Sequence, residues 1–216
     1  MSAGVATAAV TIGHLRRQAR DLLKDAGIVN AVRETDWLLA SALGVPSHVL
    51  ILEGARQVSA LRAEQARALF TRRAARAPLQ YLLGTQEFRG LDMAVTPDVL
   101  IPRPETELLV EEALQAVVGI AEPVLADVGT GSGCIAVTIA CECPEATIYA
   151  LDISAAALAV AQFNTARQGM RDRIRFVQAD LLGAFCVAEA FDVIVDRKST
   201  RLNSSHIQKS RMPSSA

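Results

Sequence analysis

The stretch Pro123-Val-Leu-Ala-Asp-Val-Gly-Thr-Gly-Ser-Gly133 decides the fold of this chain of 216 residues. It begins with an apolar run typical of a buried strand and enters a turn with three glycines. The chain continues into Cys134-Ile-Ala-Val-Thr-Ile-Ala-Cys141, which has the composition of a helix. Glycine lets a backbone turn tightly and approach a ligand without a Cβ clash, and a helix start presents backbone N–H groups to ligand oxygens. The pattern of strand, glycine turn and helix therefore predicts a nucleotide-binding loop.

A second apolar run, 146–151, ends at Asp152, which lies 19 residues after Gly133. An acid at the tip of the second strand can accept hydrogen bonds from both hydroxyls of a ribose. A dinucleotide fingerprint would place its third glycine where Cys134 stands, so this spacing favours a different nucleoside ligand. Asp127 is placed either to hold the loop or to meet the amino-acid end of a ligand.

These residues resemble the S-adenosylmethionine (SAM) site of class I methyltransferases. Two further stretches, Leu79-Gln-Tyr-Leu-Leu-Gly-Thr-Gln-Glu-Phe88 and Leu100-Ile-Pro-Arg-Pro-Glu-Thr-Glu107, resemble the N5-glutamine methyltransferases of peptide chain release factors. The resemblance runs from about residue 12 to Val195. It implies SAM as the cofactor, with Asp152 at the ribose and a backbone cradle formed by Gly129, Thr130, Gly131, Ser132 and Gly133.

Two more parts of the site are expected. Asp180 follows the third predicted strand and is placed to accept from the adenine amino group, with Leu181 against the ring face. Alternatively, Asp180 only caps the next turn. The resemblance puts Arg103 and Glu105 on the substrate side, where two prolines stiffen the backbone around Arg103. The same arm would also serve as a cover for the sheet edge.

Strands and helices alternate from residue 123 onward. Alternation of this kind predicts a parallel sheet with helices on its faces, and ligands in such sheets bind outside the carboxyl ends of the strands. The predicted strands are 123–128, 146–151, 173–178 and 191–195, and the predicted helices are 133–141 and 154–168. The fold class is α/β: an incomplete class I methyltransferase (Rossmann-like) sheet with a small N-terminal helical domain.

The chain is predicted to have four parts. Residues 1–78 form a helical substrate-docking domain, 79–107 a connector with a hairpin around Gly90 and the Arg103 arm, 108–195 a partial SAM-binding domain, and 196–216 a disordered tail. On the last helix of the first domain, one side carries four arginines that form either a docking stripe or an ordinary solvated face. They are Arg62, Arg72, Arg73 and Arg76.

The sequence departs from the family after Val195. The family places Asn-Pro-Pro-Tyr there, but this chain reads Asp196-Arg-Lys-Ser-Thr200 and continues in serine and basic residues. We interpret 196–216 as foreign to the fold; the alternative is a natural basic tail that binds RNA. Without further strands, 191–195 is expected to be an exposed apolar edge.

The missing motif matters for the chemistry. An amide nitrogen is a poor nucleophile, because its lone pair is delocalised into the carbonyl. In the family, the Asn side chain and a Pro carbonyl accept the two N–H groups of the substrate amide and align its nitrogen with the sulfonium methyl group. No side chain between Asp196 and Thr200 reproduces this arrangement. We therefore expect no catalytic residue in this chain and no activity.

Composition and charge limit the other classes of function that the chain could have. Net charge is −1, with a basic front: residues 1–90 carry 12 Lys/Arg against 7 Asp/Glu. This distribution is compatible with a partner that is part of an RNA machine, but ordinary solvated faces are the favoured explanation. The apolar start, 2–10, has no basic residues before it and is too short to span a membrane. The spacing of Cys134, Cys141 and Cys143 fits no common zinc pattern, so no metal is expected.

The sequence thus predicts a cytoplasmic, monomeric, SAM-dependent enzyme family that methylates the glutamine side-chain amide of release factors. No membrane and no direct nucleic-acid partner is expected. The alternatives are an amino-methyltransferase acting on nucleic acid, a non-catalytic SAM-binding fragment, and a docking module built on the helical domain. A dinucleotide-dependent oxidoreductase fits less well because the third glycine is misplaced.

Overall fold

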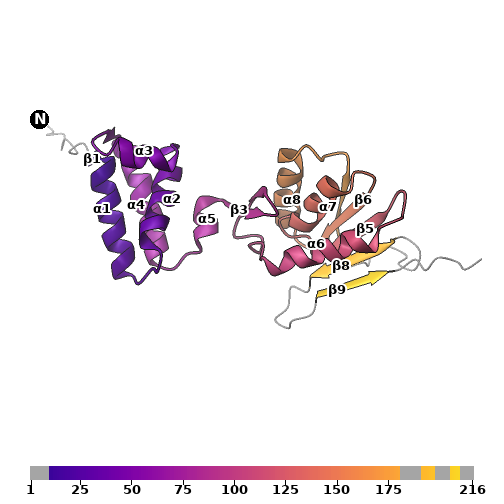
Figure 1. Cartoon of the computed structure of the whole chain (residues 1–216). Coiled ribbons are helices and arrows are strands. Elements are labelled where there is room, and N and C mark those ends of the chain that lie inside the picture. Colours follow the sequence, from indigo (N-terminus) through magenta and orange to yellow (C-terminus); the bar gives the residue numbers. More distant parts are fainter. Residues whose placement is uncertain (1–9, 181–190, 198–204, 210–216) are drawn as a thin grey trace, which may run out of the picture. The chain divides into compact units, whose positions relative to one another are not determined.

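The computed structural model describes residues 10–180, 191–197 and 205–209, the last five and residue 197 by their backbone alone. The chain divides into two compact units, Met1–Leu83 and Gly84–Ala216, and each has its own hydrophobic core (Figure 1).

The first unit is built from helices, as predicted. They are α1 (Ile12–Asp25), α2 (Ala31–Leu43), α3 (Ser47–Leu52), α4 (Ala60–Ala74) and α5 (Leu79–Leu83). Two of these helices have side-chain caps at their starts, because the Thr11 hydroxyl accepts from the backbone N–H of His14 and the Ser59 hydroxyl accepts from that of Arg62. A short antiparallel pair, β1 (Val10–Thr11) and β2 (Gln57–Val58), was not predicted, since two-residue strands carry no detectable alternation.

The boundary between the units differs from the predicted one. We expected a connector over 79–107, but helix α5 packs with the first core through Leu82, while Phe88 and Met93 pack in the second. The division therefore lies between Leu83 and Gly84. A separate connector is not found because both halves of the segment carry enough apolar side chains to join a core.

The arginine stripe on α4 is mostly used inside the first unit. Arg62 donates to the carbonyl oxygen of Ala42 at 2.9 Å, and Arg76 donates to that of Ala26 at 2.7 Å. Arg73 donates to the Glu34 carboxylate at 2.5 Å. Three of the four predicted docking residues thus tie α4 to its neighbours, which corrects the interpretation of a free charged face.

The second unit begins with the predicted hairpin, formed by β3 (Thr85–Phe88) and β4 (Leu91–Ala94). Its two-residue turn has φ of +47° at Arg89 and +76° at Gly90. This left-handed pair matches the twist of a hairpin, and the second position favours glycine. Helix α6 (Glu105–Ala116) follows, with Pro104 immediately before its first residue.

The predicted parallel sheet is confirmed. Its elements are β5 (Val124–Val128), α7 (Cys134–Glu142), β6 (Thr147–Asp152), α8 (Ala155–Arg167), β7 (Ile174–Gln178), β8 (Val193–Arg197) and β9 (Ser205–Lys209). The strand order is β7-β6-β5-β8-β9, and the first four strands are parallel. Every predicted strand and helix is present, with ends that differ by one or two residues.

Helix α7 occupies the centre of the main core. All residues from Cys134 to Ala140 are buried, because the helix packs against the sheet and against both α6 and α8 (Figure 1). A helix that is apolar on all sides is expected in such a position. The hairpin adds Phe88 and Met93 to the same core.

The edge of the sheet differs from two predictions. We expected an exposed edge at 191–195 and a disordered tail over 196–216. Instead β8 continues to Arg197, and β9 pairs with it antiparallel over five residues, with Asp196 opposite His206. The unpaired backbone N–H and C=O groups of an edge strand favour such pairing, and that tendency does not depend on side-chain hydrophobicity. The other tail residues, 198–204 and 210–216, lie outside the described residues, so the prediction of disorder is not tested there.

The ion pair of Arg73 with Glu34 generates a stability prediction. Its side chains are only 16% and 10% exposed, so Arg73→Ala leaves a largely buried carboxylate without its main partner. We expect this substitution to lower the free energy of unfolding by about 2–4 kcal/mol in denaturant titrations. The exposed neighbour Arg72 gives the control, since Arg72→Ala should change stability by less than about 0.5 kcal/mol. Equal effects of the two substitutions would contradict this account.

Candidate functional site

The glycine turn leaves β5 in a conformation that requires glycine. The backbone φ is +72° at Gly129, +56° at Gly131 and +78° at Gly133. Gly133 also needs to lack a side chain for packing, because a Cβ there would lie 3.0 Å from the Cβ of Ala161 on α8. Among the described residues, a Cβ on Gly131 would meet only the carbonyl oxygen of Gly129, at 3.9 Å. As far as those residues show, the space above Gly131 is therefore open.

Most backbone donors of the loop are bound within the protein. The carbonyl oxygen of Leu151 accepts from the N–H groups of Gly129 and Thr130, at 2.9 and 2.8 Å. Gly133 donates to the carbonyl of Thr130, and Gly131 donates to the Asp152 carboxylate at 3.0 Å. These four groups of the predicted cradle hold the loop in shape, and the loop offers a ligand open space rather than these donors.

The loop residues do not all face outward. Gly129 is exposed and Gly131 is half-buried, whereas Thr130, Ser132 and Gly133 are buried. The Thr130 hydroxyl donates to the buried Asp127 carboxylate at 2.6 Å. Only the first and second glycines of the predicted set are thus accessible from outside.

Asp127 fixes the junction between the loop and helix α7. Its Oδ2 accepts from the Thr130 hydroxyl and, at 3.2 Å, from the backbone N–H of Ala136. The residue is 2% exposed. Of the two roles predicted for Asp127, these contacts support the structural one, that of holding the loop.

Asp152 lies at the end of β6, next to the loop. One carboxylate oxygen accepts from the N–H of Gly131, and the other accepts from the N–H of Ser154 at 2.9 Å. The residue remains half-buried. Each oxygen has a second lone pair beyond these hydrogen bonds, so the carboxylate can accept donors from a ligand.

Asp180 lies close to the same edge. It follows β7, whose last residue Gln178 is opposite Asp152, and the N–H of Ala179 donates to the backbone carbonyl of Asp152 at 3.1 Å. Asp180 is exposed. The structure therefore brings the loop, Asp152 and Asp180 to the carboxyl ends of three adjacent strands, whereas Leu181 lies outside the described residues.

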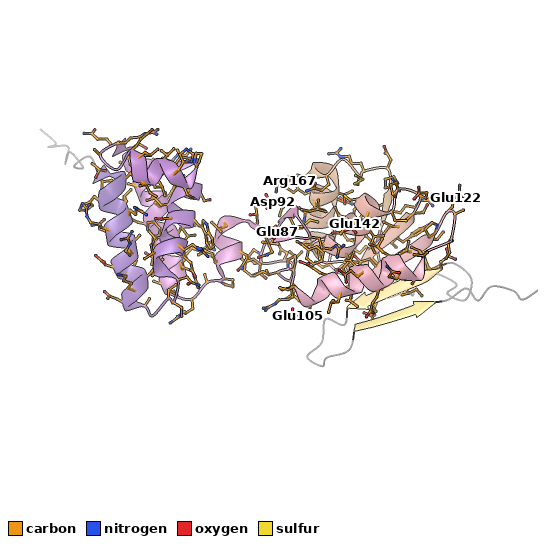
Figure 2. The ribbon with its side chains drawn as sticks, in the orientation of Figure 1. Glu87, Asp92, Glu105, Glu122, Glu142 and Arg167 are labelled. Atoms are coloured by element: carbon orange, nitrogen blue, oxygen red, sulfur yellow. The ribbon has the colours of Figure 1, made fainter. Side chains whose placement is uncertain are left out.

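The predicted substrate-side arm lies at the start of α6. Glu105 is exposed (Figure 2). Arg103 is exposed too, and its carbonyl oxygen accepts from the N–H of Thr106. Within the described part of the chain, no recorded hydrogen bond joins either side chain to the glycine loop. Whether the arm takes part in the site remains a prediction.

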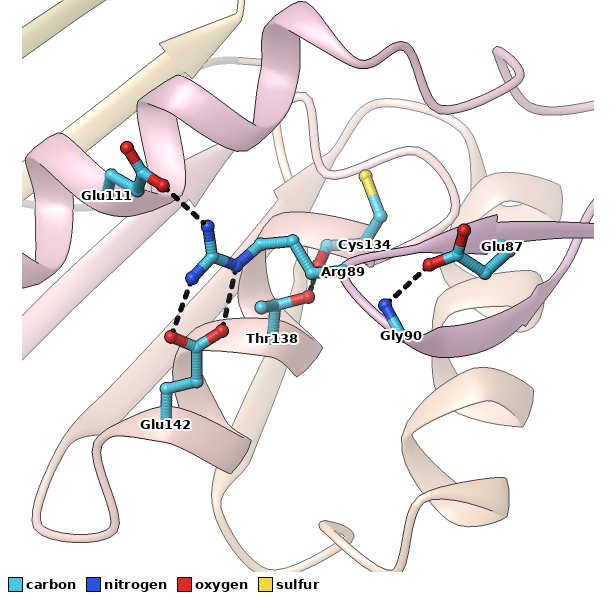
Figure 3. Close-up of polar contacts among 7 residues, drawn as sticks. All are labelled: Glu87, Arg89, Gly90, Glu111, Cys134, Thr138 and Glu142. Carbon is cyan, nitrogen blue, oxygen red and sulfur yellow. Dashed lines mark hydrogen bonds and ion pairs between the residues drawn. The ribbon is translucent and has the colours of Figure 1, made fainter.

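Sequence reasoning missed Arg89, which fastens the hairpin to two helices. Its guanidinium donates to Glu142 on α7 at 2.8 and 2.9 Å, and to Glu111 on α6 at 3.2 Å (Figure 3). The hydrogen bond with Glu142 is the largest of the effects that raise the pKa of Arg89. A charged residue at a hairpin turn looks solvated in the sequence, so no local signal identifies this role.

Sequence reasoning also missed Asn164, although a polar amide on the apolar face of a predicted helix could have identified it. It is a fully buried amide on the face of α8 that also carries Ala157 and Ala161. A buried amide needs hydrogen-bond partners, which is a reason to look for them near such a residue.

The cysteines give no metal site within the residues that the structure describes. No group of three or more His, Cys, Asp or Glu side chains there could hold a metal ion. Burial is the main cause that raises the pKa of the Cys141 thiol, which favours the unreactive thiol form. In the same described ranges, no helix has the length and apolar character needed to cross a membrane.

Comparison with known proteins identifies both units. The PrmC N-terminal domain family matches residues 14–84, and a methyltransferase domain family matches residues 122–212. Similar solved structures include an RNA methyltransferase from Salinibacter ruber in complex with S-adenosyl-L-homocysteine, which is 24% identical over 44% of this chain and 58% of that chain, with a TM-score of 0.37. A SAM-dependent methyltransferase from Agrobacterium tumefaciens is 17% identical over 51% of this chain and 37% of that chain, with a TM-score of 0.42.

Relatives with greater sequence identity include three that are named release factor glutamine methyltransferase. The protein from Geobacter sulfurreducens is 45% identical over 74% of this chain and 56% of its own length. That from Bordetella pertussis is 44% identical over 82% of this chain and 64% of its own length, and that from Burkholderia pseudomallei is 48% identical over 73% and 57%. The chain thus spans less than two thirds of each of these relatives. The chain thus contains matches to a PrmC N-terminal domain and to a methyltransferase domain, and over most of its own length it is similar to release factor glutamine methyltransferases.

Proposed function

We propose that the second unit binds SAM at the carboxyl ends of β5, β6 and β7. The loop from Gly129 to Gly133 lies under the ligand, Asp152 accepts from the ribose hydroxyls, and Asp180 with Leu181 contacts the adenine. The observation that carries this proposal is the position of the Asp152 carboxylate, which is hydrogen-bonded to the N–H of Gly131 and still half-buried. One acid thus holds the loop and is accessible to a ligand beside it.

The residues present fit a nucleoside of this kind. The open space above Gly131 can hold part of a ligand, and a side chain at position 131 would occupy that space. Each oxygen of Asp152 accepts one recorded protein N–H and keeps capacity for a hydroxyl donor. The exposed Asp180 comes two residues after Gln178, which pairs with Asp152 in the next strand, so both acids lie at strand ends, where ligands of such sheets bind.

We further propose that the family activity is methylation of the glutamine side-chain amide nitrogen of a release factor. SAM supplies the electrophilic methyl group when bound. The reaction would form a bond between the substrate nitrogen and the methyl carbon, break the methyl–sulfur bond to leave S-adenosylhomocysteine, and release one proton from the nitrogen to solvent. The neutral amide of the substrate must be held in line with the methyl–sulfur bond. Such positioning lowers the activation barrier by up to about 7–11 kcal/mol in the best intramolecular cases.

This chain is proposed to bind the cofactor without catalysing the reaction. Strand β8 carries Asp196 opposite Val128, and its last residue is Arg197. Asp196 therefore lies in the last part of β8, opposite the end of β5, and the family places Asn-Pro-Pro-Tyr after this strand. The sequence from Asp196 onward offers no equivalent amide and proline carbonyl. It continues with Arg197 and Lys198, and positive charge at this point of the chain would oppose a sulfonium.

The proposed partner is the release factor itself, met in the cytoplasm by a monomer without direct contact to nucleic acid. The names of the relatives support the protein partner. Any docking by the first unit would depend on surfaces other than Arg62, Arg73 and Arg76, because these side chains already bind neighbouring groups.

The glycine loop gives a matched pair of variants that tests cofactor binding. Gly131→Ala and Gly169→Ala both place a side chain at positive φ, +56° and +74°, in open space. Each should cost about 1–2 kcal/mol of stability. Only the alanine at 131 enters the proposed ligand space, so in calorimetric titrations with SAM its affinity should fall by at least about tenfold. Equal SAM affinities in the two variants would rule out the proposed location.

A methyl-transfer assay tests the proposed loss of activity. With radiolabelled SAM and a release factor, this chain should transfer no label above background, whereas the Bordetella pertussis relative should label the factor. RNA and DNA substrates serve as further arms, because label on nucleic acid would favour the amino-methyltransferase alternative. A rate within about tenfold of the relative, equal to about 1.4 kcal/mol in barrier height, would contradict the proposal.

A further inference from the structure

The amide of Asn164 joins two segments that are far apart in the sequence. Its oxygen accepts from the backbone N–H of Ala94 at 2.7 Å, and its nitrogen donates to the carbonyl of Ala94 at 3.0 Å. The same nitrogen donates to the carbonyl oxygen of Ser132 at 2.8 Å. One side chain therefore binds the last residue of the hairpin and the middle of the glycine loop at once.

The surroundings make these contacts hard to replace. Asn164 has no exposed surface, so water cannot take over the hydrogen bonds if the amide is lost. Buried polar groups left without partners are costly. Three groups would be affected: the N–H and C=O of Ala94 and the C=O of Ser132.

Helix α8 adds a steric contact beside the polar ones. Ala161 lies one turn before Asn164 and packs against Gly133 so closely that any side chain on that glycine would collide with it. Ser132 and Gly133 are thus held from the same face of α8, one by the amide and one by contact. Helix α8 therefore contributes to the position of the second half of the loop.

The hairpin has a separate attachment to α8 at the surface. Asp92 on β4 forms an ion pair with Arg167, and both side chains are substantially exposed (Figure 2). Exposed pairs of this kind contribute little. The buried amide of Asn164 is therefore the stronger link between β4 and α8, and it lies where the chain leaves the hairpin toward the Arg103 arm.

We propose that Asn164 is a positioning residue that sets the glycine loop relative to the end of the hairpin and so keeps the cofactor space open. Its effect on the ligand rests on the proposed SAM site, but its effect on the loop does not. Asn164 touches no part of the proposed ligand space and acts through Ser132 and Ala94.

The test compares Asn164→Asp with Thr165→Val. Aspartate has nearly the same shape and still accepts from Ala94, but its second oxygen faces two carbonyl oxygens and cannot donate as a carboxylate. Thr165 is also buried, and among the described residues its hydroxyl donates only to the carbonyl of Ala161 within α8. Thr165→Val therefore controls for a lost buried hydrogen bond on the same helix. Asn164→Ser, which removes the amide without adding charge, replaces the aspartate variant if that variant does not fold.

Two readouts decide the proposal. Hydrogen exchange at the N–H groups of Gly131 and Gly133 should accelerate by about tenfold or more in the Asn164 variant and remain unchanged in Thr165→Val. SAM affinity, measured where each variant is fully folded, should fall by about tenfold only in the Asn164 variant.

The failures of the two proposals are distinguishable. If the unsubstituted chain gives no heat with SAM, the proposed function fails, and hydrogen exchange alone judges the role of Asn164. If the chain binds SAM but the loop N–H groups exchange at the unsubstituted rate in the Asn164 variant, Asn164 only anchors the hairpin and the inference is wrong. Equal weakening of SAM binding in both variants would also overturn the inference.

Discussion

The carbonyl oxygen of Leu151 accepts the N–H groups of both Gly129 and Thr130, and the candidate site depends on this shared acceptor. Leu151 lies opposite Val128 in the parallel pair of β5 and β6, so the register of two strands places the acceptor under the turn. The carboxylate of Asp152, the next residue, accepts a hydrogen bond from the N–H of Gly131. The shape of the loop is therefore set by the end of the neighbouring strand, and any shift in register would move the site.

Buried polar side chains extend this arrangement into the core. Asp127 binds Thr130 and Ala136, and Asn164 binds Ser132 and Ala94. A polar group in an apolar interior must find partners within the protein, and both residues find them in the backbone or side chains of the loop. Packing of the second unit and the shape of its candidate site thus rest on the same hydrogen bonds.

Charged residues serve different purposes in the two units. In the first unit, Arg62, Arg73 and Arg76 bind carbonyl and carboxylate groups of neighbouring segments. In the second, Arg89 joins the hairpin turn to α6 and α7, with its side chain 20% exposed. The hydrogen bonds of these arginines arise from tertiary neighbours. For this reason a helical projection alone could not show which of these arginines bind neighbouring segments.

The sequence by itself determined the α/β class, the helical first unit, the hairpin at Gly90 and each parallel strand, because these follow from apolar periodicity, caps and turn residues, all local properties. It also indicated Asp152 and Asp180 as residues at strand ends. Only the tertiary structure decided that the N–H groups of the loop are hydrogen-bonded within the protein and that Asn164 binds both Ala94 and Ser132. The pairing of β9 with the edge of β8 was likewise decided only there. Those features depend on which backbone donors and acceptors are left unpaired after the chain has folded, and residue type alone does not carry that information.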